Sequence, residues 1–410
     1  MPEFLNLLPP TKALQLWFAN LPISQPPPER IKVADALGRI NAREITSPEP
    51  LPAFDRSTVD GYAVIASDTF GSSETLPAYL ALDEEIPMGR PAVRPLKQGR
   101  AAPIHTGGML PPGANAVIML EHTQLARPGE LEILRPVAPL ENILTTGEDL
   151  KAGELILKSG ARLRPADIGG LMALGILEMD VFYKPSIAIL SSGDEVIPPN
   201  QKPNTGQVRD INSYSLGNLV QQHGGSPHSY GILPDREDEF FVRLNEALEE
   251  NDGAVVTAGS SASTRDLTAR VIQRLGSPGV LVHGVNVKPG KPTILAVCNG
   301  KPIIGLPGNP VSALVVANLF LVPLLQRLSG ATPTPQPTIL AHLAINLSSQ
   351  AGREDWFPVC LGQSESGWQA EPVFYKSNLI FSLVQADGLI RISPESTGLS
   401  AGEMVEVYLL

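Results

Sequence analysis

The feature that most constrains the fold is an alternation of short apolar runs and amphipathic segments within residues 182–330. Buried-strand runs occur at 187–190, 254–257, 280–282, 293–297 and 303–304. Segments with helical spacing lie between them or follow them, at 213–223, 236–251, 267–275 and 311–328. Alternation of strands and helices is typical of an open, mostly parallel sheet covered by helices. We therefore expect a central α/β domain over residues 182–330.

The flanking segments have different patterns. Residues 1–44, together with 150–181, predict a helical and linker domain, with helices at 13–20, 30–37 and 166–177. Residues 45–149 alternate short apolar runs with Gly/Pro turns, which favours a β-rich domain. A proline-containing stretch at 331–337 begins the last segment, and its short alternating runs up to residue 410 predict a C-terminal β-barrel. The expected molecule is a multidomain α/β protein.

Charge and composition exclude several classes of function. The chain has 410 residues and a formal net charge of −11, which disfavours nucleic-acid binding. Its longest apolar stretch, residues 313–325, is too short to cross a bilayer, and the N-terminus lacks the features of a signal peptide. We therefore expect a cytoplasmic protein that binds neither membrane nor nucleic acid. The two cysteines have no metal-site spacing, and no GxSxG or GxGxxG motif occurs.

Four loops follow the expected strands, where open α/β sheets bind ligands. They are 191–195, 208–212, 257–266 and the pair of turns PGKP (289–292) and PGNP (307–310). The last two loops suit an anion, because small residues expose backbone N–H groups and a helix N-terminus attracts negative charge. Lys288 and Lys291 flank one turn, and Ser312 opens the helix after the other. The spacing from Gly284 to Lys291 does not match a P-loop.

Carboxylates accompany these loops and the β-rich segment. Asp60, Asp149, Glu195, Asp210 and Asp266 stand out. Hard cations such as Mg²⁺ prefer oxygen ligands, and phosphate substrates often carry the metal with them. Four of the five also have a structural interpretation: Asp210 and Asp266 as helix-capping acids, and Asp149 and Asp60 as turn residues.

Seven further segments form an ordered set: DRSTVDGYAV (55–64), HTGGMLPPGANAVIMLE (105–121), GEDLKAGE (147–154), ILSSGDE (189–195), GQVRDIN (206–212), KPGKP (288–292) and GLPGNPVSA (305–313). In order and spacing they resemble the MoeA-type molybdopterin molybdenumtransferase family, which includes the C-terminal domain of gephyrin. The resemblance covers residues 5–410. It implies a homodimer with the active site at the subunit interface, and a reaction of adenylated molybdopterin with molybdate that needs Mg²⁺ and releases AMP.

The resemblance also implies roles for individual residues. The catalytic set is Asp60, Thr106, Asp149, Glu195, Asp210 and Asp266, of which Glu195, Asp210 and Asp266 bind the metal. Lys288, Lys291 and Ser312 match an oxyanion site, and Arg353 and Ser377 match a further anion site in the last domain. The molybdopterin adenylyltransferase and apo-molybdoenzymes are the expected protein partners.

The chain departs from the family pattern at four positions: Ala258 and Ser263 stand where glycine is usual, and Leu144 and Pro358 where arginine is usual. Two other functions therefore stay open beside the transferase. One is a noncatalytic molybdopterin-binding carrier or scaffold, and the other is the adenylation step itself.

Overall fold

The computed structural model describes residues 7–22, 25–258, 262–365 and 367–410, without the side chains of 262–266. The chain forms two compact units. Unit 1 contains Met1–Ala42, Gly160–Arg164 and Met179–Leu410, and unit 2 contains Arg43–Ser159 and Pro165–Glu178. The expected division into four domains remains a prediction, and each unit is described here by itself.

Unit 1 contains a six-stranded mixed sheet in the order β16-β13-β17-β21-β20-β18. Its strands are β13 (Ser186–Ser192), β16 (Ser226–Leu233), β17 (Gly253–Ala258), β18 (Pro278–His283), β20 (Ile294–Cys298) and β21 (Lys301–Pro307). Strands β16, β13, β17 and β21 run parallel, and β20 is antiparallel to both of its neighbours. The expected mostly parallel sheet is confirmed.

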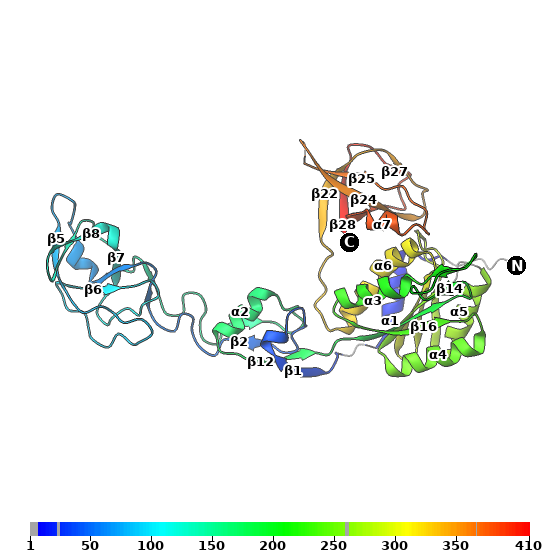
Figure 1. Ribbon diagram of the computed structural model, residues 1–410, viewed down its shortest axis with the longest axis horizontal. Coiled ribbons are helices and arrows are strands. Elements are labelled where there is room, and N and C mark those ends of the chain that lie inside the picture. Colours follow the sequence, from blue (N-terminus) through cyan, green and yellow to red (C-terminus); the bar gives the residue numbers. More distant parts are fainter. Residues whose placement is uncertain (1–6, 23–24, 259–261, 366) are drawn as a thin grey trace. The chain divides into compact units, whose positions relative to one another are not determined.

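Helices cover both faces of this sheet (Figure 1). They are α1 (Pro10–Ala19), α3 (Asn212–Gln222), α4 (Glu237–Glu250), α5 (Ala262–Leu275) and α6 (Pro310–Leu328). Side chains alternate across β13: Ile187 and Ile189 join the core under α1, α3 and α6, while Ala188 and Leu190 join the core under α4 and α5. This burial on both faces explains why the strand is an unbroken apolar run.

Helix α6 lies at the centre of the first core. By length and composition alone it is apolar enough to cross a membrane. However, Val316, Phe320 and Leu321 are fully buried in the α/β core. Truncating a buried phenylalanine such as Phe320 to alanine costs about 3–5 kcal/mol, so the apolar character of α6 is explained by core packing.

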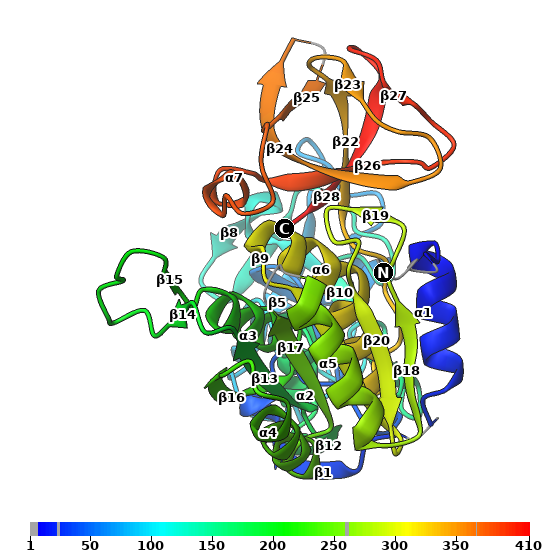
Figure 2. The same ribbon diagram turned by 90° about the vertical axis from the view of Figure 1, so that its right-hand side faces the viewer.

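The C-terminal strands close into a barrel (Figure 2). Its strands are β22 (Thr338–Leu343), β24 (Glu354–Ser364), β25 (Gly367–Pro372), β26 (Gly388–Ile392) and β28 (Met404–Leu409). Neighbours pair in the order β24-β25-β22-β28-β26, and β26 pairs again with β24. The predicted β-barrel is confirmed. The barrel segment also contains β23 (Leu347–Ser348), β27 (Gly398–Leu399) and a one-turn helix, α7 (Phe381–Val384), which the sequence did not predict.

Unit 2 is built on a second six-stranded sheet, in the order β7-β4-β6-β5-β9-β8. Its strands are β4 (Gly61–Val64), β5 (Ala78–Leu82), β6 (Arg100–Ile104), β7 (Ala116–Met119), β8 (Thr123–Arg127) and β9 (Glu130–Ile133). Short ladders join β2 (Ile45–Thr46) to β11 (Leu155–Leu157) and β3 (Arg56–Ser57) to β10 (Ile143–Leu144). The unit also holds α2 (Pro165–Ala173), η2 (Ala66–Thr69) and η3 (Leu120–His122). The expected β-rich segment is confirmed.

The helix expected at residues 30–37 is wrong. The segment forms strand β1 (Pro28–Lys32) and a single 3-10 turn, η1 (Val33–Asp35). Strand β1 pairs with β12 (Glu178–Phe182), which lies far away in sequence. The local spacing was compatible with a helix, but a distant partner strand decides the backbone conformation.

Candidate active site

Asp60 and Thr106 form a direct contact in unit 2. The Asp60 carboxylate (Oδ1) accepts a hydrogen bond from the Thr106 backbone N–H at 2.7 Å and another from its hydroxyl at 3.1 Å. These bonds, with the nearby imidazole of His105, lower the pKa of Asp60. Asp60 is thus held as an exposed, ionised carboxylate, as binding of a cation requires.

Gly61 fixes the position of Asp60. It begins β4 opposite Met119 of β7, and a Cβ at this position would lie 1.9 Å from the carbonyl oxygen of Ile118. Only glycine allows the two strands to approach so closely. The Asp60-Gly61 pair is compatible with a turn when the sequence is considered by itself. In the structure it instead precedes and begins strand β4.

Asp149 lies on an exposed turn of unit 2. Its backbone N–H donates to the carbonyl of Leu51 at 3.1 Å, and Gly147 precedes it with φ +74°. The structure thus agrees with the turn interpretation of the backbone. The carboxylate is exposed. Its expected catalytic role remains a prediction.

In unit 1, polar side chains meet at the carboxyl ends of β13 and β17. The Ser191 hydroxyl is 3.0 Å from Asp210 Oδ1, 2.9 Å from the Ser213 hydroxyl and 3.1 Å from the Thr257 hydroxyl. The chain leaves β13 for β16 on one side and later returns to β17 on the other, so this is the switch point of the sheet, where such folds bind ligands.

Asp210 is buried, with 6% exposure, and also accepts the Ser213 backbone N–H at 3.1 Å. It therefore caps the start of α3, as the structural interpretation predicted. The capping bond uses Oδ1, so the capping role does not by itself exclude a second role for the other carboxylate oxygen.

Glu195 lies beside a carboxylate that the sequence did not single out, Asp235. The short ladder of β14 (Val196–Ile197) and β15 (Val208–Arg209) follows Glu195, which is exposed. Burial, followed by the negative charges of Asp194 and Glu195, raises the pKa of Asp235. Asp235 comes two residues after β16, whose end pairs with Ser192. Recognition of that strand in the sequence would have identified it.

Three buried oxygens of unit 1, one of them on Asp235, lack hydrogen-bond partners in the described structure. They are Asp235 Oδ1, Ser192 Oγ and Asn212 Oδ1. Oxygen atoms of this kind are what Mg²⁺ prefers. Within the described residues no three Asp, Glu, His or Cys side chains are grouped as a ready metal site. The side chain of Asp266, the third expected ligand, lies outside the described residues.

The N-terminus of α6 brings the α/β sheet and the barrel segment together. The Val311 backbone N–H donates to the Ser377 carbonyl at 3.1 Å, and Asn309 Nδ2 donates to the Ser377 hydroxyl at 3.0 Å. Ser312 is buried in the same first turn. Asn212 Nδ2 bonds to the Gly308 carbonyl at 2.8 Å, so the switch-point loops contact this helix start.

Lys288 and Lys291 lie on the turn that packs against the same helix. Lys288 belongs to β19 (Val287–Lys288), which pairs with Asp355 of β24. Between the lysines, Gly290 has φ +114°, and a Cβ there would lie 2.1 Å from Val316 Cγ2 on α6. Glycine is required both for the backbone conformation and for this contact. Both lysine side chains are exposed.

Arg353 has a partner within the chain. Its Nε and Nη2 donate to the two oxygens of buried Asp355 at 2.6 and 3.0 Å. This fork orients the guanidinium and leaves other N–H groups for an anion. Because Asp355 pairs with Lys288 across the strands, Arg353 lies in the same region as the lysine turn.

The structure shows the backbone position of three of the residues that depart from the family pattern. Ala258 is the last residue of β17, pairs with Pro307, and does not have positive φ. Alanine therefore fits this backbone. Leu144 pairs with Arg56 in the β3–β10 ladder, and Pro358 is buried opposite Leu389 in β24. The side chain of Ser263 lies outside the described residues.

A cleft of 980 Å³ lies elsewhere in unit 1. Ser186, Lys301 and Pro302 line it, at the amino ends of β13 and β21. Its lining contains no expected site residue whose side chain the structure describes. The expected residues instead lie at the carboxyl ends of the strands and in the loops of unit 2, so cavity size does not locate the candidate site.

Family models match the chain in three segments. Residues 8–175 match the MoeA N-terminal region (domain I and II), residues 188–327 a probable molybdopterin binding domain, and residues 341–410 the MoeA C-terminal region (domain IV). These segments follow the order of the structural parts described above.

Relatives and solved structures match over nearly the whole chain. A molybdopterin biosynthesis protein of Methanocaldococcus jannaschii is 35% identical, covering 99% of this chain and 98% of its own. The molybdopterin molybdenumtransferase of Haemophilus influenzae is 32% identical, covering 92% and 93% respectively. A crystal structure of a molybdopterin biosynthesis MoeA protein from Pyrococcus horikoshii is 33% identical, with a TM-score of 0.86 and coverage of 99% and 100%.

The fold and the strand-end loops therefore define a multidomain α/β protein of the MoeA fold. The chain belongs to the MoeA-type molybdopterin molybdenumtransferase family and has a role in molybdenum cofactor biosynthesis.

Proposed function

We propose that this chain is a cytoplasmic molybdopterin molybdenumtransferase. Its substrates are adenylated molybdopterin and molybdate, and its products are AMP and a dithiolene that carries molybdenum. The names of the relatives from Haemophilus influenzae and Bacillus subtilis support the reaction class. The contact of Ser377 with the start of α6 is the single observation that carries the proposal furthest, because it unites the two expected anion sites in one place.

Molybdate is proposed to bind at this start of α6. A tetrahedral dianion suits a helix N-terminus with the hydroxyls of Ser312 and Ser377 nearby. Lys288 and Lys291 supply positive charge, and the fork of Arg353 is preset by Asp355. The departures at Leu144 and Pro358 lie outside these contacts.

Asp60, Glu195 and Asp210, with Asp235 and Asp266, are proposed to hold Mg²⁺ with the phosphoanhydride of the substrate. A bound divalent cation would neutralise charge on the anhydride and stabilise the charge that develops at phosphorus. The buried oxygens of Ser192 and Asp235 that lack partners support the choice of a hard cation. Thr106 holds the Asp60 carboxylate in position, and Asp149 is proposed to act on the same side of the substrate.

We further propose that the enzyme is a homodimer with shared active sites. The expected residues divide between the two units: Asp60, Thr106 and Asp149 belong to unit 2 and the remainder to unit 1. A site shared between two subunits requires such a division. The adenylyltransferase that supplies the substrate and the apo-molybdoenzymes that accept the product are the proposed partners.

The test is release of AMP from adenylated molybdopterin by the purified chain, with Mg²⁺, in the presence and absence of molybdate. We expect release that depends on molybdate. Tight binding of the substrate without release would instead establish a carrier, and transfer of AMP from ATP to molybdopterin would establish an adenylyltransferase. Either result would refute the proposal.

A further inference from the structure

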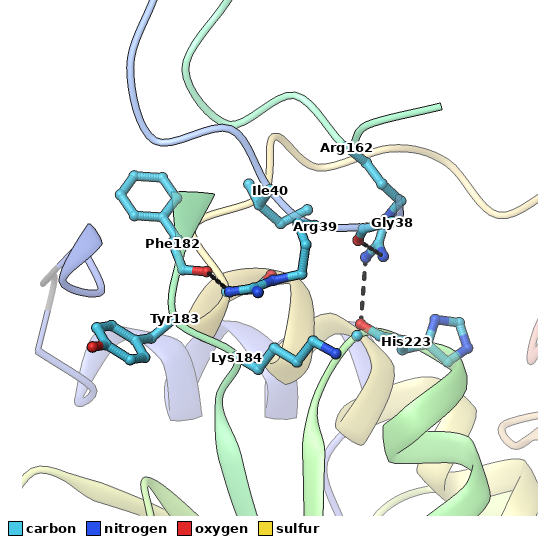
Figure 3. Close-up of a pocket in the computed structure, with 10 residues that line it drawn as sticks. Gly38, Arg39, Ile40, Arg162, Phe182, Tyr183, Lys184 and His223 are labelled. Atoms are coloured by element: carbon cyan, nitrogen blue, oxygen red, sulfur yellow. Dashed lines mark hydrogen bonds between the residues drawn. The ribbon is translucent and has the colours of Figure 1, made fainter. Parts of the chain in front are cut away.

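A second group of basic side chains lies in unit 1, away from the residues discussed so far. It surrounds a small depression that residues of unit 1 alone line. Backbone from Gly38 to Ile40, from Phe182 to Lys184 and from the end of α3 forms its walls. Figure 3 shows this depression and the side chains around it.

Among the described residues, three cations and no acidic side chain line the depression. Arg39 donates to the Phe182 carbonyl at 2.8 Å and forms an ion pair with Glu29, which compensates its charge. Arg162 donates to the carbonyls of Gly38 and His223 at 3.1 and 3.3 Å. Both of these partners are neutral, so the charge of Arg162 remains uncompensated.

Lys184 is the third cation. In the described structure its ammonium group has neither a hydrogen bond nor an ion pair, and the residue is exposed. Figure 3 shows Lys184 extending toward the His223 carbonyl, which Arg162 reaches from another side. Two uncompensated positive charges therefore converge, in a chain whose formal net charge is −11.

The imidazole of His223 lies beside Arg162, and its pKa is lowered. Burial, followed by the charge of Arg162, lowers the pKa of His223. The ring thus stays neutral near neutral pH and adds no cation of its own. Gly224, next to it, has φ +86°, and a Cβ there would lie 3.2 Å from Arg162 Nη1. Glycine thus leaves room for the guanidinium beside the helix end.

The size of the depression fits a small ligand. Its empty volume, including open solvent, is about 220 Å³. A phosphate group is small enough for this space, and its oxygens accept hydrogen bonds from arginine and lysine.

We propose that Arg162 and Lys184, with Arg39 beside them, form a binding site for a phosphate group at this depression. Inorganic phosphate and the phosphate of a nucleotide share this chemistry. Because both cations are partly solvated, we expect dissociation constants on the order of millimolar. The site is separate from the oxyanion residues around α6 and does not depend on the proposed catalysis.

Calorimetric titration of the full-length chain with inorganic phosphate, at constant ionic strength set by chloride, tests the proposal. The titration uses a Lys291→Met background, so that phosphate bound beside α6 contributes little. Lys184→Met removes a charge that makes no contact within the chain, and Arg162→Gln keeps N–H donors for the carbonyls. Lys12→Met is the matched control, because Lys12 is exposed on α1 and does not line the depression.

We expect one saturable site whose dissociation constant rises at least about fivefold in Lys184→Met and in Arg162→Gln, since each loses one charged contact, but not in Lys12→Met. A parallel titration with AMP identifies the source: tighter, Lys184-dependent binding of AMP assigns the site to a nucleotide phosphate, and equal binding assigns it to phosphate alone. Phosphate binding that is absent, or is the same in Lys184→Met and Lys12→Met, would overturn the proposal.

Discussion

Asp60 and Thr106 contact each other twice across 46 residues of sequence: both the backbone N–H and the hydroxyl of Thr106 donate to the same carboxylate oxygen, Oδ1. The other oxygen of Asp60 is thereby left for a ligand. The pairing of β4 with β6, in which Gly61 lies opposite Ile104, sets this geometry. Strand pairing in the sheet brings these two distant residues together. The effect of Thr106 on the pKa of Asp60 can be measured directly.

Replacing Thr106 by valine removes the hydroxyl bond and keeps the backbone bond. We expect the pKa of Asp60 to rise from its lowered value toward the usual range for aspartate, because one donor to the ionised form is lost. A pKa lowered by folding stabilises the fold above the unfolded pKa, and this contribution disappears as pH falls through the folded pKa. Carboxylate NMR titration of ¹³C-labelled protein measures the change.

Thr146→Val is the control for this substitution. Thr146 donates to Asp55 Oδ1 through its backbone N–H at 2.7 Å and its hydroxyl at 2.8 Å, which is the same arrangement. It should leave the pKa of Asp60 unchanged. An equal shift of the Asp60 pKa in both variants would show that unit 2 responds globally and that the Thr106 hydroxyl has no specific effect.

Mixed dimers test whether the active site is shared. We expect Asp60→Asn and Lys291→Met each to abolish most turnover. When the two variants are unfolded together and refolded in equal amounts, half of the dimers are mixed, and each mixed dimer has one intact site out of two. Activity should return to about a quarter of that of the unaltered protein. If both residues served the same subunit's site, mixing would restore no activity.

Gly290→Ala tests the turn that carries the lysines. The added Cβ meets Val316 and the backbone has φ +114°, so we expect a loss of about 1–3 kcal/mol of stability, with a weaker response to molybdate. Gly217→Ala, in helix α3 of the same domain, is the matched control. Its Cβ would meet Pro227 at an ordinary 3.7 Å, and it should be neutral or slightly stabilising. Equal melting temperatures in the two variants would show that the turn tolerates a side chain.

Asp235→Asn tests the buried carboxylate beside Glu195. Folding raises the pKa of Asp235, so its ionised form destabilises the fold above that pKa, while below the unfolded pKa both states are protonated and no penalty exists. We expect the variant to melt about 1–3 °C higher than the unaltered protein at pH 7, with no difference near the pH where the carboxyl is protonated in both states.

The same variant reports on the metal. Adding Mg²⁺ should raise the melting temperature of the unaltered protein more than that of Asp235→Asn, since a cation that binds only the folded chain stabilises it. A variant that melts lower than the unaltered protein at pH 7 in the absence of metal would contradict the assigned cause of the pKa shift. An equal Mg²⁺ response in both proteins would remove Asp235 from the proposed metal site.

The elements that the sequence predicted well are those whose pattern reflects burial. The run that became β13 is apolar because both of its faces are covered, and the spacing of Phe240, Leu244 and Leu248 matches one face of α4. The start of α6 was equally evident, because the PGNP turn precedes a long apolar segment.

The features that the sequence did not predict depend on distant contacts. Residues 30–32 belong to strand β1 because β12 pairs with it. Trp17 is buried in the α/β core, where its Nε1 donates to the Ala296 carbonyl at 2.8 Å. Strand β16 was missed because its partly exposed residues lack a clear alternation, and Asp235 was missed with it. The sequence identified the candidate site residues individually. The contact between Ser377 and the start of α6 was not evident from the sequence, because it depends on how the barrel segment packs against that helix.

In the proposed reaction, molybdenum insertion is coupled to cleavage of the adenylated substrate. The most direct measurement is the ratio of AMP released to molybdenum bound by the pterin product, followed by chromatography with metal analysis of the same fractions. We expect one AMP for each molybdenum, and loss of both products together in Lys291→Met. AMP release that continues without molybdate, at the same rate and with no molybdenum in the product, would contradict it.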